Sequence, residues 1–340
     1  MRFEIIKDNK ERFKNSILEM WKNYLPDTSP GRYEWLNNGN PAGETSWYLA
    51  VEKRSNELAG IITVMPKELF INNRVIRAGI LGDFMIKDKY RAFGPALELP
   101  KAVIREANTL GYEYLYTVPN GASKKVIERI GFKTAGIEKR FVRPIKLDRY
   151  LKAYFNKLYA PAISMIEKLY MLWNVSISLY HSGVACRVTD IDSSFDELWR
   201  EVRQNRVSVM MGDHCSAYLR WRYMLNPEHE YQIIKLKNKK DERLRGYLIY
   251  YMEEGRLYVC DIVACKRSCI NALIYQAIKT AYEENCYGAY ISILDKNPIQ
   301  PYLKYFSMLN VKSDEVNVMS WGSNELSTMQ WAYFSGERNQ

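Results

Sequence analysis

The stretch from Asp88 to Val103, DKYRAFGPALELPKAV, holds the residues best suited to bind a charged ligand. Arg91, Gly94 and Ala96 stand there in the spacing Arg-x-x-Gly-x-Ala, between an apolar run and a helix-like run. The first N–H groups of a helix have no partner within it and lie at the positive end of its dipole, so such a turn can bind phosphate. Short glycine motifs also occur in ordinary strand-to-helix loops, so the surrounding sequence must decide.

The composition limits the class of partner. The chain has 340 residues, of which 49 are Lys or Arg and 39 are Asp or Glu. The length fits two domains, and the net charge of +10 suits a nucleotide cofactor, a nucleic acid or an anionic membrane face. Nucleic-acid binding is not expected, because the excess charge is scattered and no nucleic-acid motif accompanies it. The charged start and the lack of an apolar run of about 20 residues predict a cytoplasmic protein without a transmembrane segment.

The six cysteines all lie in the second half of the sequence. Cys260, Cys265 and Cys269 are close together, but they form no Cys-x-x-Cys pair, and YVCDIVAC is typical of a strand in which cysteine is a small apolar residue. We therefore expect no metal site. Disulfides are not expected either, because the predicted compartment is reducing.

Strand and helix patterns surround the Arg91 turn. Strands are predicted at 46–52, 57–65 and 78–87, with a hairpin turn at Asn72-Asn73. A helix is predicted from Ala96 to Leu110, followed by a strand, a short helix that ends at Gly131, and a final strand. The predicted order is β-β-β-β-α-β-α-β with mixed strand polarity.

That order and three groups of residues resemble the GCN5-related N-acetyltransferase (GNAT) superfamily over most of residues 1–145. The first group, Arg91-x-x-Gly94-x-Ala96, is similar to the acyl-coenzyme A pyrophosphate loop. The second, Asn120 with Ala122 and Ser123, is similar to an Asn-x-x-Ala segment of the family. The third, Ile130-Gly131-Phe132, is similar to a helix ending of the family. Together they favour the phosphate-binding interpretation of the turn.

The resemblance implies that acetyl-CoA, or another acyl-CoA, is the co-substrate. Loop amides and the helix N-terminus would hold its pyrophosphate, and a gap between two central strands would let the pantetheine amides pair with strand backbone near Met85 and Ile86. The implied coenzyme-binding residues are Met85, Ile86, Arg91, Ala92, Phe93, Gly94, Ala96, Asn120 and Ser123.

Three residues depart from the family pattern. Pro95 has no N–H, so the loop has one donor fewer, although proline suits the first helical position. Phe93 replaces a basic residue often found before the glycine, and Ile127 stands where many members have a tyrosine that protonates the leaving thiolate. An unusual or inactive transferase is therefore an alternative. The Gly-Pro-Ala-Leu version of the loop has a looser resemblance to GNAT-type proteins encoded with bacterial surface-polysaccharide genes.

An internal repeat extends the resemblance to the second half. Four residues recur 186 positions later: Trp35, Asn40, Pro41 and Gly60 as Trp221, Asn226, Pro227 and Gly246. Beyond the hairpin the offset falls to 178, which pairs Asp83 with Asp261 and Gly94 with Ala272 and predicts a shorter hairpin in the second copy. We expect an α+β fold of two tandem GNAT-like domains, each a mixed, mostly antiparallel sheet flanked by helices.

The predicted domains are 1–145, with the acyl-CoA loop, and 183–340, a degenerate copy. Because Cys269 and Ala272 take the places of the arginine and glycine of the loop, only the first domain is expected to bind the coenzyme. Residues 146–182 are predicted as a helical linker, rich in aromatic and basic residues and interrupted by Pro161. The apolar spacing favours a helix pair packed on the sheets, and a segment at an anionic lipid surface is the alternative.

Three residues are candidates for proton transfer. Acyl transfer to an amine needs a base that removes the ammonium proton. Asp83 is the acid nearest the predicted gap, although Asp261 has the same place in the copy without the loop, which favours a shared structural role. Tyr116, on the strand across the gap, is the second candidate. His214 is the third, although a lone histidine is more often packed or exposed than a base.

The leading hypothesis is an acyl-CoA-dependent N-acyltransferase that acetylates an amine of a small molecule, an amino sugar or a peptide in a cleft between the domains. A catalytically inactive acyl-CoA-binding or interaction module is the second hypothesis. A Fem-type aminoacyl transferase fits the duplication, but such enzymes do not depend on this loop for coenzyme A. The sequence names neither the acceptor, the acyl length nor the oligomeric state.

Overall fold

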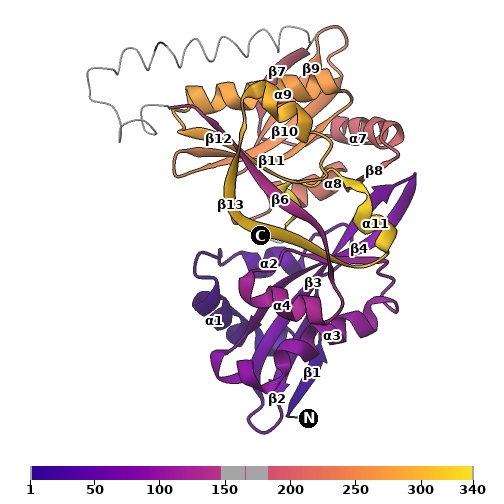
Figure 1. The fold of residues 1–340 in the computed structure, drawn as a ribbon, viewed down its shortest axis with the longest axis vertical. Coiled ribbons are helices and arrows are strands. Elements are labelled where there is room, and N and C mark those ends of the chain that lie inside the picture. Colours follow the sequence, from indigo (N-terminus) through magenta and orange to yellow (C-terminus); the bar gives the residue numbers. More distant parts are fainter. Residues whose placement is uncertain (1, 147–164, 166–182, 339–340) are drawn as a thin grey trace.

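One mixed β-sheet runs through both halves of the chain. A computed structural model of the protein describes residues 2–146, Met165 and 183–338 (Figure 1). Its strands are β1 (Phe3–Lys7), β2 (Ser46–Glu52), β3 (Glu57–Ile71), β4 (Arg74–Ile86), β5 (Tyr114–Thr117), β6 (Lys133–Pro144), β7 (Gly183–Val188), β8 (Val209–Gly212), β9 (Gln232–Asn238), β10 (Leu244–Glu253), β11 (Arg256–Ala264), β12 (Gly288–Leu294), β13 (Leu309–Gly322) and β14 (Gln330–Trp331).

Helices cover both faces of this sheet. They are α1 (Lys14–Tyr24), α2 (Arg32–Asn37), α3 (Pro95–Ala107), α4 (Gly121–Arg129), α7 (Ser194–Asn205), α8 (Ser216–Leu219), α9 (Arg267–Glu283), α10 (Gln300–Leu303) and α11 (Asn324–Thr328), with short 3-10 turns η1 (Glu11–Phe13), η2 (Asp88–Phe93), η5 (Lys304–Phe306) and η6 (Ser335–Glu337) and the π-helical turn η4 (Arg220–Met224). The predicted linker, residues 146–182, lies almost entirely outside the described residues.

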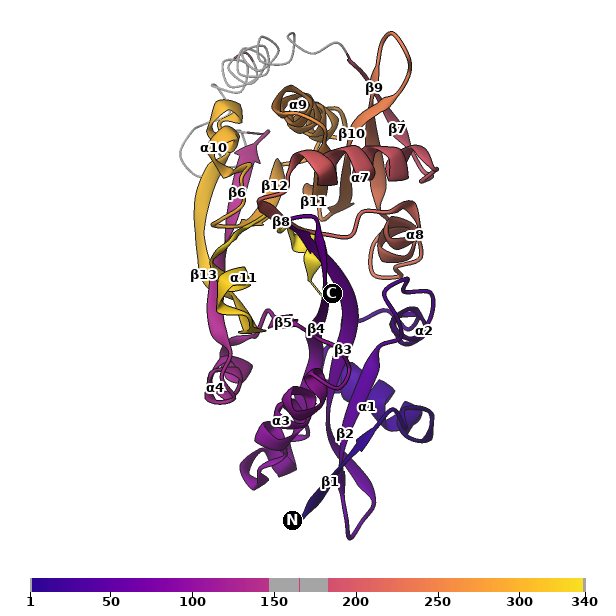
Figure 2. The same cartoon turned by 90° about the vertical axis from the view of Figure 1, so that its right-hand side faces the viewer.

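The two halves exchange their last strands. The strand order is β1-β2-β3-β4-β5-β13-β6-β12-β11-β10-β9-β7, so β13 from the second half lies beside β5, and β6 from the first half lies beside β12. The two exchanged strands also pair with each other and run side by side from one half to the other (Figures 1 and 2). The sheet of each half is therefore completed by a strand of the other.

The first half confirms the predicted strands and helices around the Arg91 turn, with two differences. Asn72 and Asn73 form the predicted hairpin turn, both with positive φ, at 51° and 58°. The hairpin is not a separate pair of short strands, because β3 runs unbroken through Pro66 to Ile71 and pairs with β4 along its length. The sequence analysis also missed β1, α1 and α2. The strand β1 is a short edge strand in which only Phe3 is buried, so its alternation is weak.

The second half repeats this order, with a shorter hairpin as predicted. Its strand β10 has 10 residues against 15 in β3, and it turns at Glu254-Gly255. The expected match of Gly94 with Ala272 is wrong. Only Cys265 and Lys266 separate β11 from α9, so Ala272 lies buried inside that helix, and the second half has no turn like η2.

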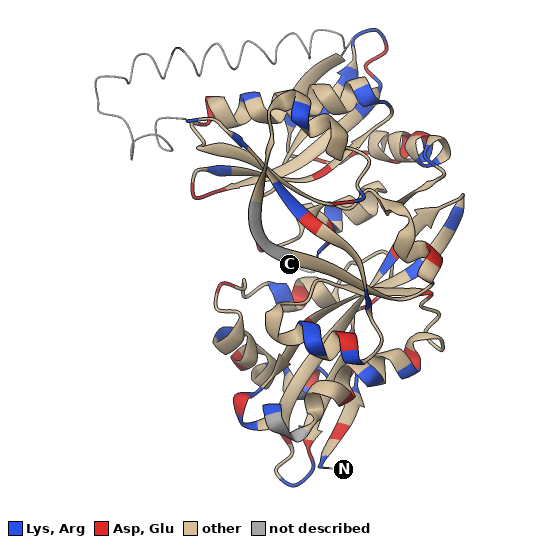
Figure 3. Ribbon diagram, in the orientation of Figure 1, with Lys and Arg blue, Asp and Glu red and all other residues tan. Residues whose placement is uncertain are grey.

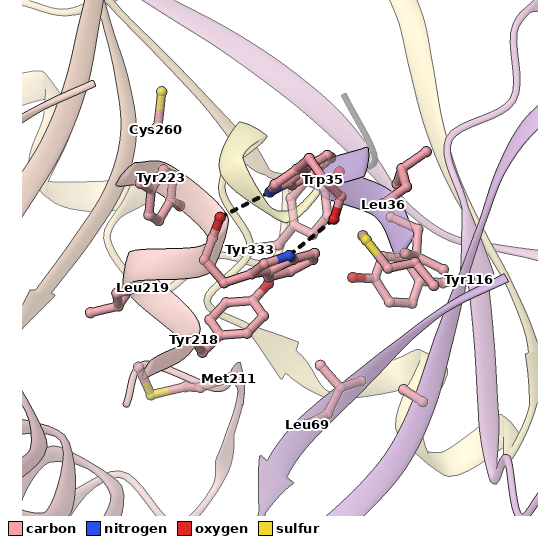
Figure 4. Close-up of a cluster of buried hydrophobic side chains, with 14 of the residues drawn as sticks. Trp35, Leu36, Leu69, Tyr116, Met211, Tyr218, Leu219, Tyr223, Cys260 and Tyr333 are labelled. Atoms are coloured by element: carbon pink, nitrogen blue, oxygen red, sulfur yellow. Dashed lines mark hydrogen bonds between the residues drawn. The ribbon is translucent and has the colours of Figure 1, made fainter. Parts of the chain in front are cut away.

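The repeated tryptophans meet at the junction of the halves. Trp35 in α2 and Trp221 in η4 stack with ring centroids 5.0 Å apart and an interplanar angle of 11°. Each indole N–H donates to the backbone of the other, Trp35 Nε1 to Trp221 O at 2.9 Å and Trp221 Nε1 to Trp35 O at 3.2 Å (Figure 4). A contact that each residue makes to its own counterpart is typical of a two-fold relation. Both rings belong to one hydrophobic core that draws side chains from the two halves.

We predict that the two tryptophans act as one unit. Trp35→Phe and Trp221→Phe should each lower the free energy of unfolding by about 2 kcal/mol, since each loses a buried hydrogen bond and part of the stack. The loss of unfolding free energy in the double variant should be clearly smaller than the sum of the two single losses, because each single change already breaks the pair. Chemical denaturation of the four proteins measures this, with Trp321→Phe, a partly buried residue of β13, as the control. Additive costs would contradict the prediction.

Candidate functional site

The strands β4 and β5 separate where the sequence analysis places the coenzyme. Their parallel pairing runs from Ala78 and Tyr114 to Leu81 and Thr117, and Thr117 Oγ1 donates to Leu81 O at 3.1 Å at the last pair. β4 continues to Ile86 with β3 as its strand partner among the described residues. Its edge from Gly82 to Ile86 is therefore open to an extended ligand backbone. The predicted gap is present, and the side chains of Met85 and Ile86 beside it are buried.

The second half has the same gap, but its own chain fills it. The pairing of β11 with β12 ends at Val259 and Ile291, although both strands continue. Phe334 forms a bridge with Ile293 in β12, and Leu294 N donates to Tyr333 O at 3.4 Å. On the other side, a side chain at Gly336 would collide with the backbone oxygen of Cys260 in β11. A segment of this protein, the strand-like residues Tyr333 and Phe334 followed by the 3-10 turn η6, thus lies where the first half offers an open strand edge.

The turn before α3 has the geometry of an anion site. Gly94 is the N-cap of α3 and has φ +97° and ψ −13°, a conformation that suits glycine. A Cβ at this position would have no atom within 4 Å, so the approach to the helix start is open. Pro95 and Ala96 are the first two residues of α3, and no side chain caps it. The backbone of Ala92 and Phe93 lies in η2, directly before Gly94.

Charged side chains position this turn. Glu57 at the start of β3 accepts hydrogen bonds from Lys89 Nζ at 2.6 Å, Tyr90 OH at 2.9 Å and Lys87 Nζ at 3.0 Å. The bond from Lys89 is the largest of the effects that lower the pKa of Glu57 to about 2, against the opposing effect of its partial burial. Arg91 is exposed and pairs with Asp88 at 2.9 Å. The turn therefore presents an exposed cation beside the start of α3. Elsewhere in the described residues, Lys and Arg lie interspersed with Asp and Glu on both halves (Figure 3).

Asn120 and Ser123 form the start of α4. Asn120 Oδ1 accepts hydrogen bonds from the backbone N and the Oγ of Ser123, both at 2.9 Å. This is an N-cap, and it explains why asparagine precedes a helix here. Both side chains are already hydrogen-bonded to each other at the start of the helix. A coenzyme contact by Asn120 or Ser123 therefore stays a prediction. Ile127, in the place of the expected tyrosine, is buried in the core beneath α3 and α4.

Asp83 lies in a β-bulge beside the gap. Asp83 and Phe84 together face the single residue Ile62 of β3, and Asp83 has φ +46°. Its side chain is buried, accepts from Thr63 Oγ1 at 2.9 Å and pairs with Arg32 Nη2 at 3.3 Å. Arg32 in turn lies 3.5 Å from a carboxylate oxygen of Glu228 in the second half. Asp83 is thus part of an ion-pair chain that crosses between the halves.

His214 pairs with the counterpart of Asp83. Its Nδ1 is 3.2 Å from Asp261 Oδ2 and 3.0 Å from Tyr247 OH, and the ring is buried. Burial by itself lowers the pKa of His214, but the Asp261 carboxylate outweighs it and raises that pKa above its ordinary value. Asp83 and Asp261 are therefore held in a similar way, each at a bulge and each by a basic side chain of its own half.

Tyr116 lies in a third polar cluster, at the junction of the halves. It is fully buried, which raises the pKa of its hydroxyl, and it donates to Glu337 O at 3.2 Å. The Glu337 carboxylate forms an ion pair with buried Lys67 from β3, and Arg222 Nε donates to Gly336 O at 2.9 Å. Lys67 and Glu337 were not predicted from the sequence. A lysine inside the apolar run of β3 was the available signal.

The three candidates for proton transfer therefore lie in three separate polar clusters. Asp83 is beside the open gap, Tyr116 is sealed between the halves, and His214 is inside the second half. Among residues 2–146 and 183–338 no group of three or more His, Cys, Asp or Glu could hold a metal ion. Cys260 is buried with its Sγ 3.6 Å from Tyr258 O.

Several solved structures share this arrangement. A conserved protein of unknown function from Enterococcus faecalis V583, described as a probable N-acyltransferase, has a TM-score of 0.68 at 11% identity, covering 94% of this chain and 72% of that chain. A GCN5-related N-acetyltransferase from Anabaena variabilis has a TM-score of 0.66 at 14% identity, with coverages of 94% and 72%. N-myristoyltransferase from Saccharomyces cerevisiae with bound myristoyl-CoA has a TM-score of 0.59 at 11% identity, with coverages of 95% and 79%. The chain has the GNAT fold.

This likeness confirms the predicted α+β class, with a mixed sheet flanked by helices. At these identities the likeness concerns the fold. No protein-family model matches the sequence, and no curated protein matches it. Within the described residues of this GNAT fold, no helix is both long and apolar enough to span a membrane.

We predict that His214 makes stability depend on pH. Its pKa is raised in the folded protein, so the stabilisation by its proton is complete below pH 6.5 and is lost as pH rises through the folded pKa. His214→Gln should abolish this fall and cost about 3 kcal/mol at pH 6, because Asp261 loses its buried partner. Thermal unfolding between pH 6 and 9 measures both effects.

His229→Gln is the matched control. Burial lowers the pKa of His229, so its effect on stability has the opposite sign. The control variant should keep the fall in stability with rising pH. A His214→Gln protein whose pH profile equals that of the unmodified chain would count against the assignment.

Proposed function

We propose that this protein is an acyl-CoA-dependent N-acyltransferase, which acetylates an amine. The observation that carries the proposal is the open edge of β4 next to the unobstructed start of α3. An extended amide-containing chain and a diphosphate at its end would occupy these two features together. The neighbours described as N-acyltransferases or solved with an acyl-CoA have the same fold, which supports the proposal.

Each group of residues has a separate part in binding. The N–H groups at Gly94 and Ala96, with the Arg91 side chain, would hold the pyrophosphate, while Pro95 contributes no donor. The backbone of β4 from Gly82 to Ile86 would pair with the pantetheine amides. Only the first half is proposed to bind, because residues 333–337 occupy the matching gap of the second half.

The chemistry would take place at the bulge of β4. A bound acyl-CoA would supply an activated acyl group. Backbone N–H groups of β4 would stabilise the negative charge that develops on the attacked carbonyl oxygen. Asp83 is the proposed base for the proton of the amine, since it is the carboxylate at this bulge and its ion pair with Arg32 holds it in place.

The acceptor amine is proposed to lie next to Asp83, where α2 of the first half faces Glu228 of the second. Ser29, Arg32 and Glu228 meet at this point, with Ser29 N donating to Glu228 Oε2 at 3.2 Å. The buried carboxylate of Asp83 and the partly buried carboxylate of Glu228 suit a positively charged amine. A small molecule, an amino sugar and a peptide all carry such a group.

A second candidate function is acyl-CoA binding without turnover. Two observations favour it. Ile127 is buried where the family resemblance implies a proton donor for the leaving thiolate, and Asp83 already has two buried partners. The two functions share the coenzyme site and differ at Asp83.

The coenzyme site is tested by two matched variants of Gly94. Asp and Asn have the same size, both tolerate a positive φ, and both are good N-caps, so each variant should fold. Gly94→Asp should weaken acetyl-CoA binding at least tenfold relative to Gly94→Asn, because its charge repels the pyrophosphate. Isothermal titration calorimetry measures the affinity. Equal affinities of the two variants would rule out a diphosphate at this turn.

The base is tested by Asp83→Asn, with Asp261→Asn as the control from the second half. Loss of a general base should lower kcat by about 100-fold or more, with little change in KM for acetyl-CoA. Asp261→Asn should lose stability but keep its turnover per folded molecule. Release of free thiol from acetyl-CoA with a panel of amines measures turnover. Equal kcat values in both variants would make Asp83 a structural residue.

A further inference from the structure

Two cysteines face each other where the second half passes from β11 to α9. The Sγ atoms of Cys265 and Cys269 are 3.8 Å apart. Backbone bonds hold both residues, since Cys265 N donates to Arg245 O at 3.0 Å and Cys269 N donates to Lys266 O at 3.1 Å. A disulfide bond is about 2 Å long. Small side-chain rotations would therefore bring the two sulfur atoms within bonding distance.

The surroundings favour a thiolate on Cys265. This residue is partly exposed and precedes a 17-residue helix that no side chain caps. The hydrogen bond with Cys269 lowers the pKa of the Cys265 thiol most, and Arg245 and Lys266 lower it further, against burial and Glu201. Cys269 is buried, and the same hydrogen bond raises the pKa of its thiol. The Cys265 sulfur is therefore suited to act as the nucleophile, and the Cys269 thiol to donate a proton.

Other cysteines have the opposite environment. Cys215 is also partly exposed, but its Sγ donates to Asp213 Oδ2 at 3.0 Å. Burial and this bond raise the pKa of Cys215 to about 12. Burial likewise raises the pKa of Cys260 and Cys286. The reactive pair is thus set apart from these three thiols by its contacts.

We propose that Cys265 and Cys269 form a dithiol site that hydrogen peroxide oxidises reversibly to a disulfide. The Cys265 thiolate attacks one peroxide oxygen, so an S–O bond forms, the O–O bond breaks, and the released hydroxide becomes water by taking a proton. The sulfur is oxidised to sulfenic acid as the peroxide is reduced. Cys269 then attacks this sulfur, the S–S bond forms, and the hydroxyl group leaves as water with the Cys269 proton. One peroxide and two thiols give one disulfide and two waters, and an external dithiol reverses the reaction.

The pair lies at the position in the second half that the coenzyme turn occupies in the first. A disulfide there would link the end of β11 to the first turn of α9 and would leave Gly94 and β4 unchanged. The proposed acyl-CoA site and the proposed dithiol site can therefore be tested independently.

Peptide mapping tests the proposal on the full chain. The purified protein is treated with one to two equivalents of hydrogen peroxide, blocked with N-ethylmaleimide and digested with trypsin. Lys266 and Arg267 separate the two cysteines, so a bridge should appear as the peptides 257–266 and 268–279 joined by a disulfide. Peptide fragmentation should place this bond at Cys265 and N-ethylmaleimide at Cys260, which lies in the same peptide. Reduction with dithiothreitol should release them. In Cys269→Ser, dimedone should label Cys265 as sulfenic acid, because the second step is blocked.

Cys215→Ser is the matched control, since serine keeps the N-cap that Cys215 gives α8. This variant should form the 265–269 bridge at the unmodified rate. Before oxidation, N-ethylmaleimide at pH 7 should label Cys265 at least tenfold faster than Cys215. Equal labelling rates of these two residues, or oxidation of Cys265 without the joined peptides, would overturn the proposal.

Discussion

The stacked pair of Trp35 and Trp221 fixes how the two halves meet. Each ring is buried, and each donates its N–H to the other's backbone, so neither half can rotate without breaking a hydrogen bond in both directions. The ion-pair chain from Asp83 through Arg32 to Glu228 passes through the same helix, α2, because Arg32 lies three residues before Trp35. The geometry of the proposed acceptor site is therefore set by the contact that joins the repeats.

The two halves share the same arrangement of strands around a gap but use that gap differently. Both have two parallel strands that separate, and both have an aspartate at a bulge next to the gap. In the first half the gap is open and the aspartate pairs with Arg32. In the second half the segment around Phe334 fills the gap and the aspartate pairs with His214. In this gap the backbone of Tyr333 and Phe334 pairs with β12, so main-chain amides can pair with a strand edge there.

The sequence was informative where local chemistry decides the structure. The Asn72-Asn73 turn, the glycine before α3 and the Asn120 cap could be predicted, since each depends on a few neighbouring residues. The strand exchange could not, because β6 and β13 would have the same pattern whichever half they joined. The cluster of Lys67, Tyr116 and Glu337 could not be predicted either, since residues 67 and 337 come into contact only in the complete fold. The match of Gly94 with Ala272 failed because the second half has lost the whole turn rather than two side chains.

The exchanged strands affect the order in which the nascent chain can become native. When the first 146 residues have left the ribosome, β5 can pair with β4 but still lacks its second neighbour, residues 319–322 of β13. At that stage β6 has no partner, since its strand partners among the described residues, β12 and β13, are both made later. The free edge of β5 and the edges of β6 therefore stay unpaired while most of the second half is synthesised. Such edges are sites of intermolecular pairing, so this fold has its greatest need of protection from aggregation during translation.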